Sequence, residues 1–454
     1  MRFHQALEAF NQKVRAEEQT KLAQTATKGF KEQFDRAEVN LTDANRLLYL
    51  SVAQSLEAKA ETMDDKELAG LLSMQGFLFH TKYSGKKYDP YVFRGLYSAL
   101  TKLSGLNYNA IKVPGGLKNK MFAVVVSKLT SAFYTTGNDG FIVQGDYAKL
   151  TTLQTVVGSN PYPNRVLALS KDEQYLINGS DSSFIQIYNL VTKDKPFKVI
   201  GHKGFVNDIK FLPDDSGFIS ASSDKTLRFT DHKTGQSKLV VSLPYNLKSI
   251  DISADGKLIA GASPSGELIL IDLSNNNSVT VLARETPNRI LAVAFHPTKQ
   301  LIAYGTELLN EKGLPYKGIV KLFDFVSQKQ IKELGGHKAG VSDIKFSPDG
   351  LLLASAGLDR HLQMWVVDHE EDLPILMDNN NGQIWDIAFS NGSDYLLTAS
   401  NNGEIRVWPT NPRMLADVVC PKLPRNMTPD EWKTYVANGI MYESTCKSLL
   451  IKDF

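Results

Sequence analysis

The sequence has few cysteines, no long apolar run and almost no net charge. Only Cys420 and Cys446 occur among 454 residues, which is too few for a disulfide-built fold and fits no zinc-ligand spacing. No run of about 18 apolar residues is present, so we expect no transmembrane helix. The formal net charge of +2 provides no strong field for nucleic acid or acidic lipid. These absences favour a protein that folds around ordinary hydrophobic cores and binds other proteins.

Motifs for catalysis and cofactor binding are missing as well. The glycine pair Gly115-Gly116 is isolated and lacks the lysine and hydroxyl residues of a phosphate-binding loop. The 8 histidines show no His-x-x-x-His pair and no carboxylate cluster at metal-ligand spacing. We therefore expect no enzyme activity, no cofactor and no metal site.

A unit of short strands organises the chain, and its clearest copy spans residues 336–365. A Gly-His pair, Gly336-His337, precedes an apolar strand, a Pro-Asp-Gly turn at residues 348–350, and two further strands that end at Trp365. Proline presets φ in such a turn, and glycine accepts the positive φ that other residues resist. The pattern therefore predicts a β-meander.

The unit recurs along the chain at a nearly constant interval. Copies that are aligned on the first strand begin at residues whose numbers differ by 41, 41, 43, 51 and 43. A more degenerate seventh copy begins near Met121. A period of about 40 to 45 residues with several strands per unit is typical of β-propeller blades. The six aligned positions are Asn164, Phe205, Asn246, Arg289, Gly340 and Gln383.

The segment before the repeats is predicted to be helical. Residues 1–60 contain no proline, and Phe3, Leu7, Phe10 and Val14 recur at helical spacing. We expect a restart of the helix near residues 40–43, a second helix over residues 64–84, and a third from Asp89-Pro90, because Asp suits the N-cap and Pro the first turn. Residues 1–60 could be helices packed on their neighbours, or a stalk or partner-binding coiled segment.

The two ends of the repeat region are expected to complete one sheet. Residues 383–408 supply only three strands, which would leave an exposed edge, so we predict that residues 107–113 add the fourth. In the tail, Thr428-Pro429-Asp430-Glu431 is a capping box that predicts a helix. The predicted architecture is mainly β, with an α-helical region at 1–105, a seven-bladed propeller at 106–410 and a helical tail at 411–454.

The repeats resemble the WD-repeat family over roughly residues 107–410. In that family a His, a Ser or Thr, an Asp and a Trp form a hydrogen-bonded chain across the blade. By resemblance, the four positions in the sixth blade are His337, Ser355, Asp359 and Trp365. The third blade matches at three positions and the last blade at two, where Asn380 replaces His and Asn402 replaces Asp. A Ser-His-Asp set can mark a hydrolase, but no nucleophile elbow is present and the blade pattern explains the spacing.

Two further features bear on binding. Asp208, Asp343 and Asp386 occupy matching places in three first strands, where they could hold a cation or, as we favour, accept hydrogen bonds from a neighbouring blade. The fifth blade carries an insertion between Tyr304 and Val320, which could serve recognition or simply be tolerated. The face that we expect to dock partners is lined by Asn164, Phe205, Asn246, Arg289, Gly340 and Gln383, with Trp385 nearby.

The flanking segments resemble a second group of proteins. Residues 45–60, 68–76 and 420–446 are similar to the segments that enclose propellers in bacterial multidomain proteins of the STAND signalling NTPase and caspase-like group. The resemblance implies a non-enzymatic scaffold or sensor module of a bacterial signalling complex with protein partners. The alternatives are a propeller hydrolase or lactonase, and a structural subunit of a membrane-associated complex that is tethered through residues 1–38.

The N-terminus and the two cysteines bear on the compartment. The N-terminus lacks the apolar core of a signal peptide, so we expect a cytoplasmic protein, with the periplasmic side of a membrane as the alternative. Cys420 and Cys446 could form a disulfide in an oxidising compartment. We favour the interpretation that both are reduced thiols.

Overall fold

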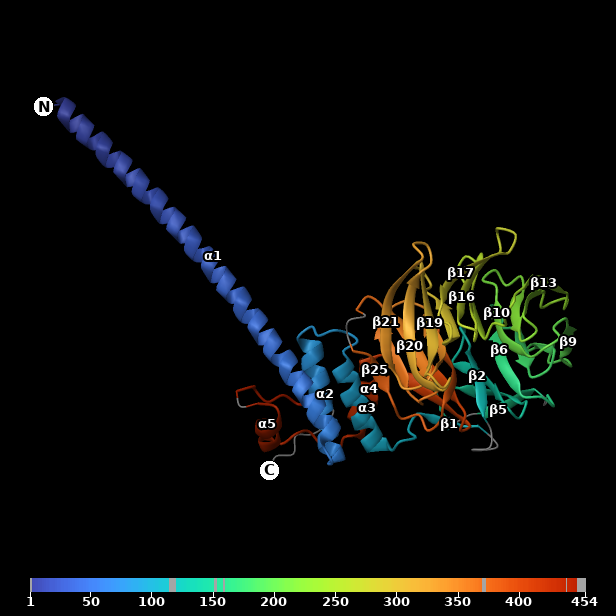
Figure 1. Ribbon diagram of the computed structural model, residues 1–454. Helices are drawn as coiled ribbons and strands as arrows, with labels where there is room; N and C mark the ends of the chain where they lie inside the picture. The colour runs from blue at the N-terminus through green and yellow to red at the C-terminus, as the bar shows by residue number, and fades with distance from the viewer. Residues whose placement is uncertain are drawn as a thin grey trace. The chain divides into compact units, whose positions relative to one another are not determined.

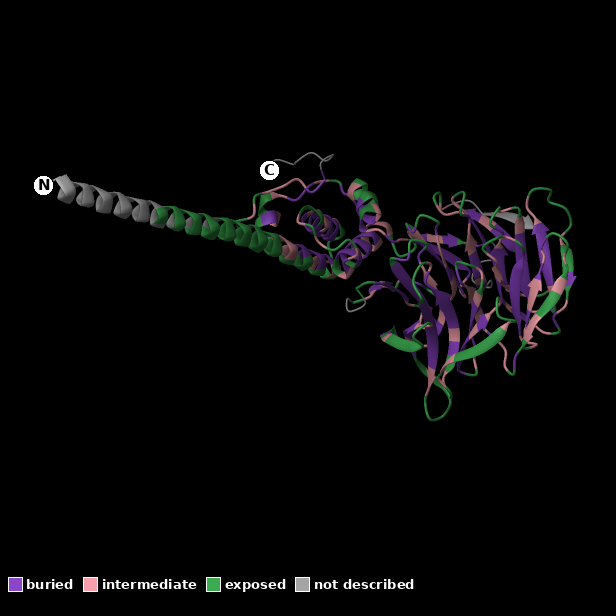
Figure 2. Ribbon diagram, turned by 90° about the horizontal axis from the view of Figure 1, so that it is seen from above, coloured by how far each residue is buried: buried purple, intermediate pink, exposed green. Residues whose placement is uncertain are grey.

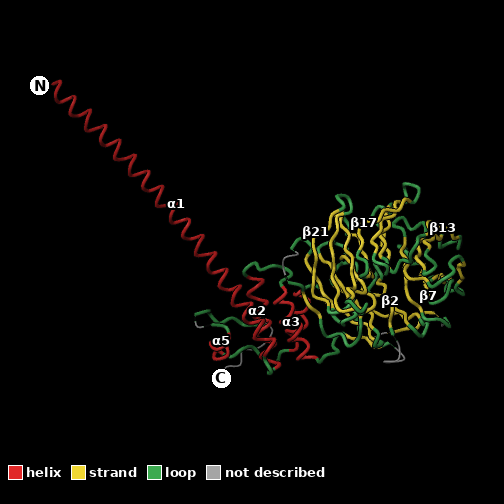
Figure 3. The backbone as a smooth tube through the Cα atoms, viewed as in Figure 1, coloured by secondary structure: helices red, strands yellow, loops and turns green. Residues whose placement is uncertain are grey.

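The computed structural model describes residues 2–113, 120–150, 153–157, 160–369, 373–437 and 439–446. For residues 2–20, 22, 23, 26, 30, 34 and 153–157 the backbone alone is described. The chain forms two compact units, which we call the helical unit (Met1–Lys87 with Leu423–Phe454) and the propeller unit (Tyr88–Lys422). The strands drawn in Figure 3 all belong to the propeller unit.

The helical unit begins with a single long helix, α1 (Arg2–Thr62) (Figure 1). The expected restart near residues 40–43 does not occur, because no proline or glycine interrupts this stretch and the Thr42 hydroxyl donates to the Glu38 carbonyl within the helix (2.9 Å). The side chains of residues 35–48 are exposed, and buried side chains first occur further along, at residues such as Ala53 and Leu56 (Figure 2). The side chains of Phe3, Leu7, Phe10 and Val14 lie outside the described residues.

The buried end of α1 packs with α2 (Lys66–Lys82), and its Lys59 ammonium donates to the Tyr435 carbonyl of α5 (Pro429–Tyr435) at 2.8 Å. The Ser73 hydroxyl of α2 donates to the Glu57 carboxylate of α1 at 2.8 Å, and both residues are buried. Phe79 of α2 meets the ring of Trp432 edge to face, with 6.0 Å between ring centroids. The capping box predicted at Thr428 is present, with the Glu431 carboxylate accepting from the Thr428 backbone N–H. No helix in the described part of the chain has the length and apolarity needed to span a membrane.

The propeller unit contains seven four-stranded antiparallel sheets, each a blade, as the repeat predicted. The first four blades are β2 (Met121–Val126) to β5 (Leu153–Val157) with β3 (Ala132–Gly137) and β4 (Ile142–Asp146); β6 (Asn164–Leu169), β7 (Tyr175–Ser180), β8 (Phe184–Asn189) and β9 (Phe197–Ile200); β10 (Val206–Phe211), β11 (Phe218–Ser222), β12 (Thr226–Thr230) and β13 (Ser237–Ser242); and β14 (Ser249–Ile252), β15 (Leu258–Ala262), β16 (Glu267–Asp272) and β17 (Ser278–Arg284).

The last three blades complete the ring. They are β18 (Arg289–Phe295), β19 (Leu301–Leu309), β20 (Pro315–Asp324) and β21 (Lys329–His337); β22 (Val341–Phe346), β23 (Leu352–Gly357), β24 (Leu362–Val366) and β25 (Ile375–Met377); and β26 (Ile384–Phe389), β27 (Tyr395–Ser400) and β28 (Glu404–Pro409) with β1 (Ala110–Lys112). The first strand of each blade contacts the first strand of the next, so these seven strands form the inner wall of the propeller.

The predicted closure of the ring is confirmed. Strand β1 pairs antiparallel with β28, and Ala110 lies opposite Arg406. The Arg406 side chain is fully buried and donates to the Leu106 carbonyl and to the side-chain oxygens of Asn107 and Asn109, at 2.9 to 3.0 Å. A buried guanidinium therefore links the last blade to the segment that precedes the first.

The unit boundaries differ from the predicted domains 1–105, 106–410 and 411–454. Helix α3 (Pro90–Ser104), with Asp89 as its N-cap, belongs to the propeller unit, because Tyr97 packs edge to face on Trp408 at 5.8 Å and donates to the Pro409 carbonyl. The tail divides: α4 (Pro412–Val419) and the short helix η2 (Cys420–Lys422) stay with the propeller, and the rest joins the helical unit. There Thr445 donates to the buried Gln75 (3.0 Å).

The structure also shows three local features that the sequence had singled out. In the Pro-Asp-Gly turn at residues 348–350, Gly350 has a φ of 73°, as the turn required. The insertion of the fifth blade lengthens the hairpin of β19 and β20, whose ladder runs on to the pair Leu309 and Pro315. Cys420 and Cys446 are both disulfide-bonded, so the interpretation of two reduced thiols is wrong for this structure.

Candidate functional site

The predicted polar chain of the sixth blade is largely present. The His337 ring forms two hydrogen bonds. Its Nδ1 lies 3.1 Å from the Asp359 carboxylate, and its Nε2 lies 2.7 Å from the Ser355 hydroxyl. The third blade repeats this arrangement with His202, Asp224 (3.1 Å) and Ser220 (2.8 Å). Buried polar groups need hydrogen-bond partners, and the groups in each of these sets are partners for one another.

Trp365 does not join the chain. Between the described side chains of Trp365 and Ser355 no hydrogen bond forms, and the indole packs in the core opposite Leu353. In the last blade the Trp408 indole N–H does donate to Thr398, at 3.5 Å, and Thr398 donates to the side-chain oxygen of Asn380, at 3.4 Å. The fourth position is therefore an apolar anchor in the sixth blade.

The electrostatics of these sets match a structural role. Burial lowers the pKa of His202, which favours the neutral imidazole. Burial alone would raise the pKa of Asp224, but hydrogen bonds from Thr226 and from the Lys203 backbone lower it to about 2. Ser355 is 0% exposed, so no substrate reaches its hydroxyl. The Ser-His-Asp geometry consequently stabilises the blade and is not placed for nucleophilic attack.

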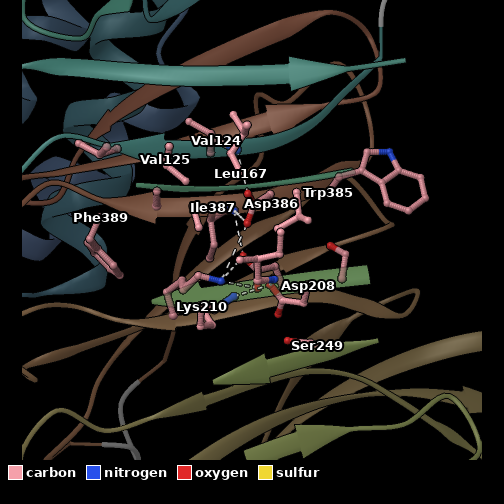
Figure 4. A pocket seen from close by; sticks show the side chains of 18 of the residues that line it. Val124, Val125, Leu167, Asp208, Lys210, Ser249, Trp385, Asp386, Ile387 and Phe389 are labelled. Carbon is pink, nitrogen blue, oxygen red and sulfur yellow. Dashed lines mark hydrogen bonds and ion pairs between the residues drawn. The ribbon is translucent and has the colours of Figure 1, made fainter. Parts of the chain in front are cut away.

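The innermost strands enclose a cavity of about 520 Å³. Its wall carries acidic, basic and apolar side chains from most of the blades, and Figure 4 shows Trp385 and Phe389 at opposite ends, with Asp208, Lys210 and Asp386 between them. Phe389 ends strand β26, while Trp385 stands near its start. We call the end at which the inner strands begin the channel mouth.

The acidic side chains of the cavity bind the next blade. Each carboxylate accepts a hydrogen bond from a backbone N–H on the following inner strand, which is the alternative that we favoured over a cation site. Four such bonds are found among the described residues, and they join Asp208 to Ile250 (2.8 Å), Asp251 to Phe295 (2.7 Å), Asp343 to Ile387 (3.0 Å) and Asp386 to Val124 (2.8 Å).

Asp251 was missed by the sequence comparison. The repeat alignment placed Ser249 at this position of the fourth blade, and Asp251 follows two residues later on β14. Because side chains two apart on a strand face the same way, Asp251 lies on the same face of β14 as Ser249, which lines the cavity. An acidic residue two places along an inner strand was the signal that could have revealed it.

Lysines neutralise part of this acidic lining. Lys345 holds both oxygens of Asp343 (2.6 and 2.7 Å), and Lys210 holds Asp208 (2.6 Å). Burial raises the pKa of Asp386 well above its ordinary value, and the nearby Asp343 raises it further. Burial would also raise the pKa of Asp343, but Lys345 outweighs it and lowers the value. The two carboxylates are therefore shifted in opposite directions, and the ionised form is favoured at Asp343 and the protonated form at Asp386.

No group of three or more His, Cys, Asp or Glu side chains with metal-binding geometry occurs among the described residues. The acidic residues of the cavity are instead occupied by backbone N–H groups and lysines.

A β-bulge at the start of the inner strands places side chains at the channel mouth. In six blades one residue bulges between two ladder pairs, and in the fourth blade Lys248 takes the same place just before β14. All seven residues line the cavity: Phe122, Arg165, Asn207, Lys248, Leu291, Ser342 and Trp385.

Aromatic and basic groups cluster in this ring. The rings of Trp385 and Phe122 meet edge to face at 5.7 Å, and the Arg165 guanidinium lies 4.6 Å from the Phe122 ring centroid. Arg165 also holds the Asp181 carboxylate through two bonds of 2.7 Å. Burial, and then the charge of Arg165, lower the pKa of Lys248. The Trp385 indole nitrogen is buried and has no hydrogen-bond partner in the described structure.

The residues predicted for the docking face fall into three groups. Phe205 is 54% exposed, and the Arg289 side chain is 45% exposed while it pairs with Glu307 (2.9 Å). Asn246, Gln383 and Trp385 are half-buried, and the Gln383 side chain accepts from Asn401 (3.0 Å). Gly340 is buried.

Asn164 does not lie on this face. It is 0% exposed on β6, and its amide nitrogen donates to the Thr136 hydroxyl (2.8 Å) and the Gly140 carbonyl (2.9 Å) of the preceding blade. The bulge residue follows it directly, at Arg165, whereas it lies two places after Phe205 in the next blade. The alignment was thus one residue out of register in the second blade.

Comparison with known proteins identifies the repeats. The model of the family "WD domain, G-beta repeat" matches residues 194–231, 328–366 and 373–409. The chain is 26% identical over 209 residues to the serine-threonine kinase receptor-associated protein of Mus musculus, covering 44% of this chain and 54% of that protein.

Two other relatives extend the picture. The chain is 24% identical over 274 residues to the apoptotic protease-activating factor 1 of Danio rerio, covering 60% of this chain and 20% of that protein. It is 21% identical over 232 residues to the transcription initiation factor TFIID subunit 5 of Caenorhabditis elegans, covering 51% of this chain and 34% of that protein. The chain therefore matches about half of the mouse relative and much smaller parts of the other two. It carries WD repeats in a seven-bladed β-propeller.

Proposed function

We propose that the protein is a non-enzymatic scaffold or sensor module that docks a protein partner at the channel mouth. The docking surface comprises Phe205, Arg289 and Trp385, together with the bulge residues around them. The observation that carries the proposal is the ring of bulges, which brings one side chain from each of the seven blades to a single end of the cavity. A site to which every blade contributes a side chain suits the binding of a protein segment that contacts several blades at once.

The chemistry of this surface fits protein recognition. Aromatic and arginine residues dominate the binding energy of protein interfaces. Phe205 is more than half exposed, so its ring is available to a partner at the mouth. Trp385 offers an indole N–H without a partner, and a partner carbonyl at the mouth would satisfy it.

The relatives support the same class of function. The mouse protein is named for its association with a receptor, and the C. elegans protein is named as a subunit of a larger factor. The resemblance of residues 45–60 and 420–446 to the STAND group adds the proposal of a bacterial signalling complex. The zebrafish relative, a protease-activating factor, supports the signalling part of this proposal.

The test compares the amount of partner that co-purifies with a triple variant of the docking surface and with a control variant altered elsewhere. We expect the variant Phe205→Ala/Arg289→Ala/Trp385→Ala to lose at least about 90% of the partner that co-purifies with the wild type, because removal of such anchors costs 1 kcal/mol or more each, roughly. The matched control is Phe197→Ala/Arg284→Ala, which removes an exposed aromatic ring and an exposed arginine from outer strands. Equal recovery by both variants would rule out the mouth as the docking surface.

A further inference from the structure

A second cavity lies at the other end of the blades, away from the channel mouth. It has a volume of about 470 Å³ and is formed by the turn after α3, by α4, and by the first and last blades. Most of its wall is apolar, with Leu100, Val407, Pro409 and Met414 among its members. All of its lining residues belong to the propeller unit.

Three polar atoms on one side of this cavity are buried without hydrogen-bond partners. They are the Ser104 hydroxyl, the Tyr108 hydroxyl and the side-chain nitrogen of Asn109. All three residues line the cavity, and they follow one another in the turn where α3 ends. A native structure seldom leaves even one such group unpaired, because each costs about 1–3 kcal/mol. Three together indicate a missing acceptor.

The orientation of Asn109 defines which atom is available. Its side-chain oxygen accepts from the Arg406 guanidinium (3.0 Å), and its backbone carbonyl accepts from the Val407 N–H (3.0 Å). Asn109 is 2% exposed. Only its amide N–H groups are left for a ligand, so this residue can act as a donor alone.

The electrostatics favour an uncharged acceptor. Burial raises the pKa of Tyr108, and Arg406 offsets this only in part, so the hydroxyl keeps its proton and can donate. Arg406 is already neutralised by Glu404 (3.2 Å). The charged lining residues Asp417 and Lys422 are exposed, so an ionised head group on the buried side of the cavity would lose its hydration without a counter-charge. A carbonyl oxygen there would gain two or three hydrogen bonds.

The remaining wall suits an aliphatic chain. The rings of Tyr147 and Tyr395 lie 5.3 Å apart on the cavity wall, and Val418 at the rim is 43% exposed. The volume lies within the range of about 300–1,000 Å³ that small-molecule sites occupy.

We propose that this cavity binds a medium-length acyl compound, with its carbonyl oxygen hydrogen-bonded to Tyr108, Asn109 and Ser104 and its chain along the apolar wall. The free acid and the ester share this chemistry, and both are used as probes. The site is separate from the docking surface at the channel mouth and does not depend on it.

The experiment titrates the full chain with methyl octanoate, methyl decanoate and decanoic acid by calorimetry. We expect saturable binding of one equivalent of methyl decanoate, about 16-fold tighter than methyl octanoate, since each buried methylene contributes about fourfold. Tighter binding of decanoic acid at pH 5 than at pH 8 would show that the site selects the neutral head group. Equal or tighter binding at pH 8 would contradict this selectivity. Absence of saturable binding for every probe would overturn the site.

Two conservative variants separate binding from folding. Tyr108→Phe and Ser104→Ala remove unpaired hydroxyls, so each should leave the melting temperature of the free protein unchanged or higher and weaken methyl decanoate binding about tenfold. A lower melting temperature for Tyr108→Phe would show that the hydroxyl already has a partner, such as water, and would contradict the proposal. Phe205→Ala, at the channel mouth, is the control and should bind the ester like the wild type.

Discussion

At the scale of single residues, the propeller places ionisable groups where the repeat pattern alone does not. The sequence predicted Asp208, Asp343 and Asp386, and the structure confirms that each binds the neighbouring blade. Asp251 and the buried position of Asn164 were not predictable from spacing, because one bulged residue changes which side chain faces the cavity. The repeat period predicts that strands recur, but it does not predict where a β-bulge shifts the pairing of two strands by one residue.

The two carboxylates Asp386 and Asp343 should respond oppositely to substitution. Asp386→Asn preserves an acceptor for the Val124 N–H and a donor for Asp343, so its free energy of unfolding at pH 7 should stay within about 0.5 kcal/mol of the wild type or exceed it. Asp343→Asn removes the short ion pair of Lys345 and leaves it, within the described structure, only the 3.9 Å contact with Asp386, so it should cost about 1–3 kcal/mol. Urea unfolding followed by circular dichroism measures both values.

The pH dependence gives an independent check on Asp386. Its folded-state pKa is raised, so between the ordinary carboxyl pKa of about 4 and the raised value the folded protein holds a proton that the unfolded chain has released. The stability contribution is therefore complete at low pH and decreases as the pH rises through this window. Asp386→Asn should lose less stability than the wild type as the pH rises from about 4 through this window, and parallel curves would contradict the raised pKa of Asp386.

At the scale of elements, the number of blades and the fourth strand of the last blade were predictable. The repeat counted the blades, and the exposed edge of a three-stranded sheet required another strand, which β1 supplies. The continuity of α1 was not predictable, since a threonine and an aspartate can either cap a helix or lie within one. The membership of α3 depends on Tyr97 and Trp408, which are more than 300 residues apart.

Arg406 should be the most sensitive position of this closure. Arg406→Met removes a buried cation, so the buried Glu404 carboxylate loses its counter-charge and, among the described residues, keeps only the 3.3 Å bond from Asn381. We expect a loss of about 3–5 kcal/mol. The matched control is Arg284→Met, which breaks an Arg–Glu pair whose arginine is 64% exposed and should cost under about 1 kcal/mol. Thermal and urea unfolding compare the two. Similar costs would show that the buried pair does not secure the ring.

At the scale of the whole molecule, the sequence predicted which regions are helical and which form blades, but not how the termini combine. The tail beyond Leu423 completes the helical unit through residues such as Trp432 and Thr445. A contact between segments that lie hundreds of residues apart leaves no periodic signal in either of them. Domain boundaries drawn from composition therefore divided one compact unit between two predicted regions.

Helix α1 supplies a prediction for assembly. Val39, Leu41, Leu47 and Leu48 are exposed on its surface, and we propose that this helix associates with a partner or a membrane-linked complex. Deletion of residues 2–48, which removes all four side chains, should shift the protein from the high-mass or membrane fraction of its host to the low-mass fraction. Its melting temperature should stay the same, because the described side chains before residue 49 are exposed. An unchanged distribution between fractions would contradict this role.

The pairing of β1 with β28 also has a consequence for biosynthesis. Arg406 bonds to the carbonyl of Leu106, a residue 300 positions earlier in the chain. At about 5–20 residues per second, a ribosome would need roughly 15–60 s to make the intervening segment. During that interval the nascent β1 has no β28 to pair with, although six sheets can already form behind it. The nascent ring is thus open between its first and last blades. It closes only when β28 has been made and pairs with β1, whichever blade folds first.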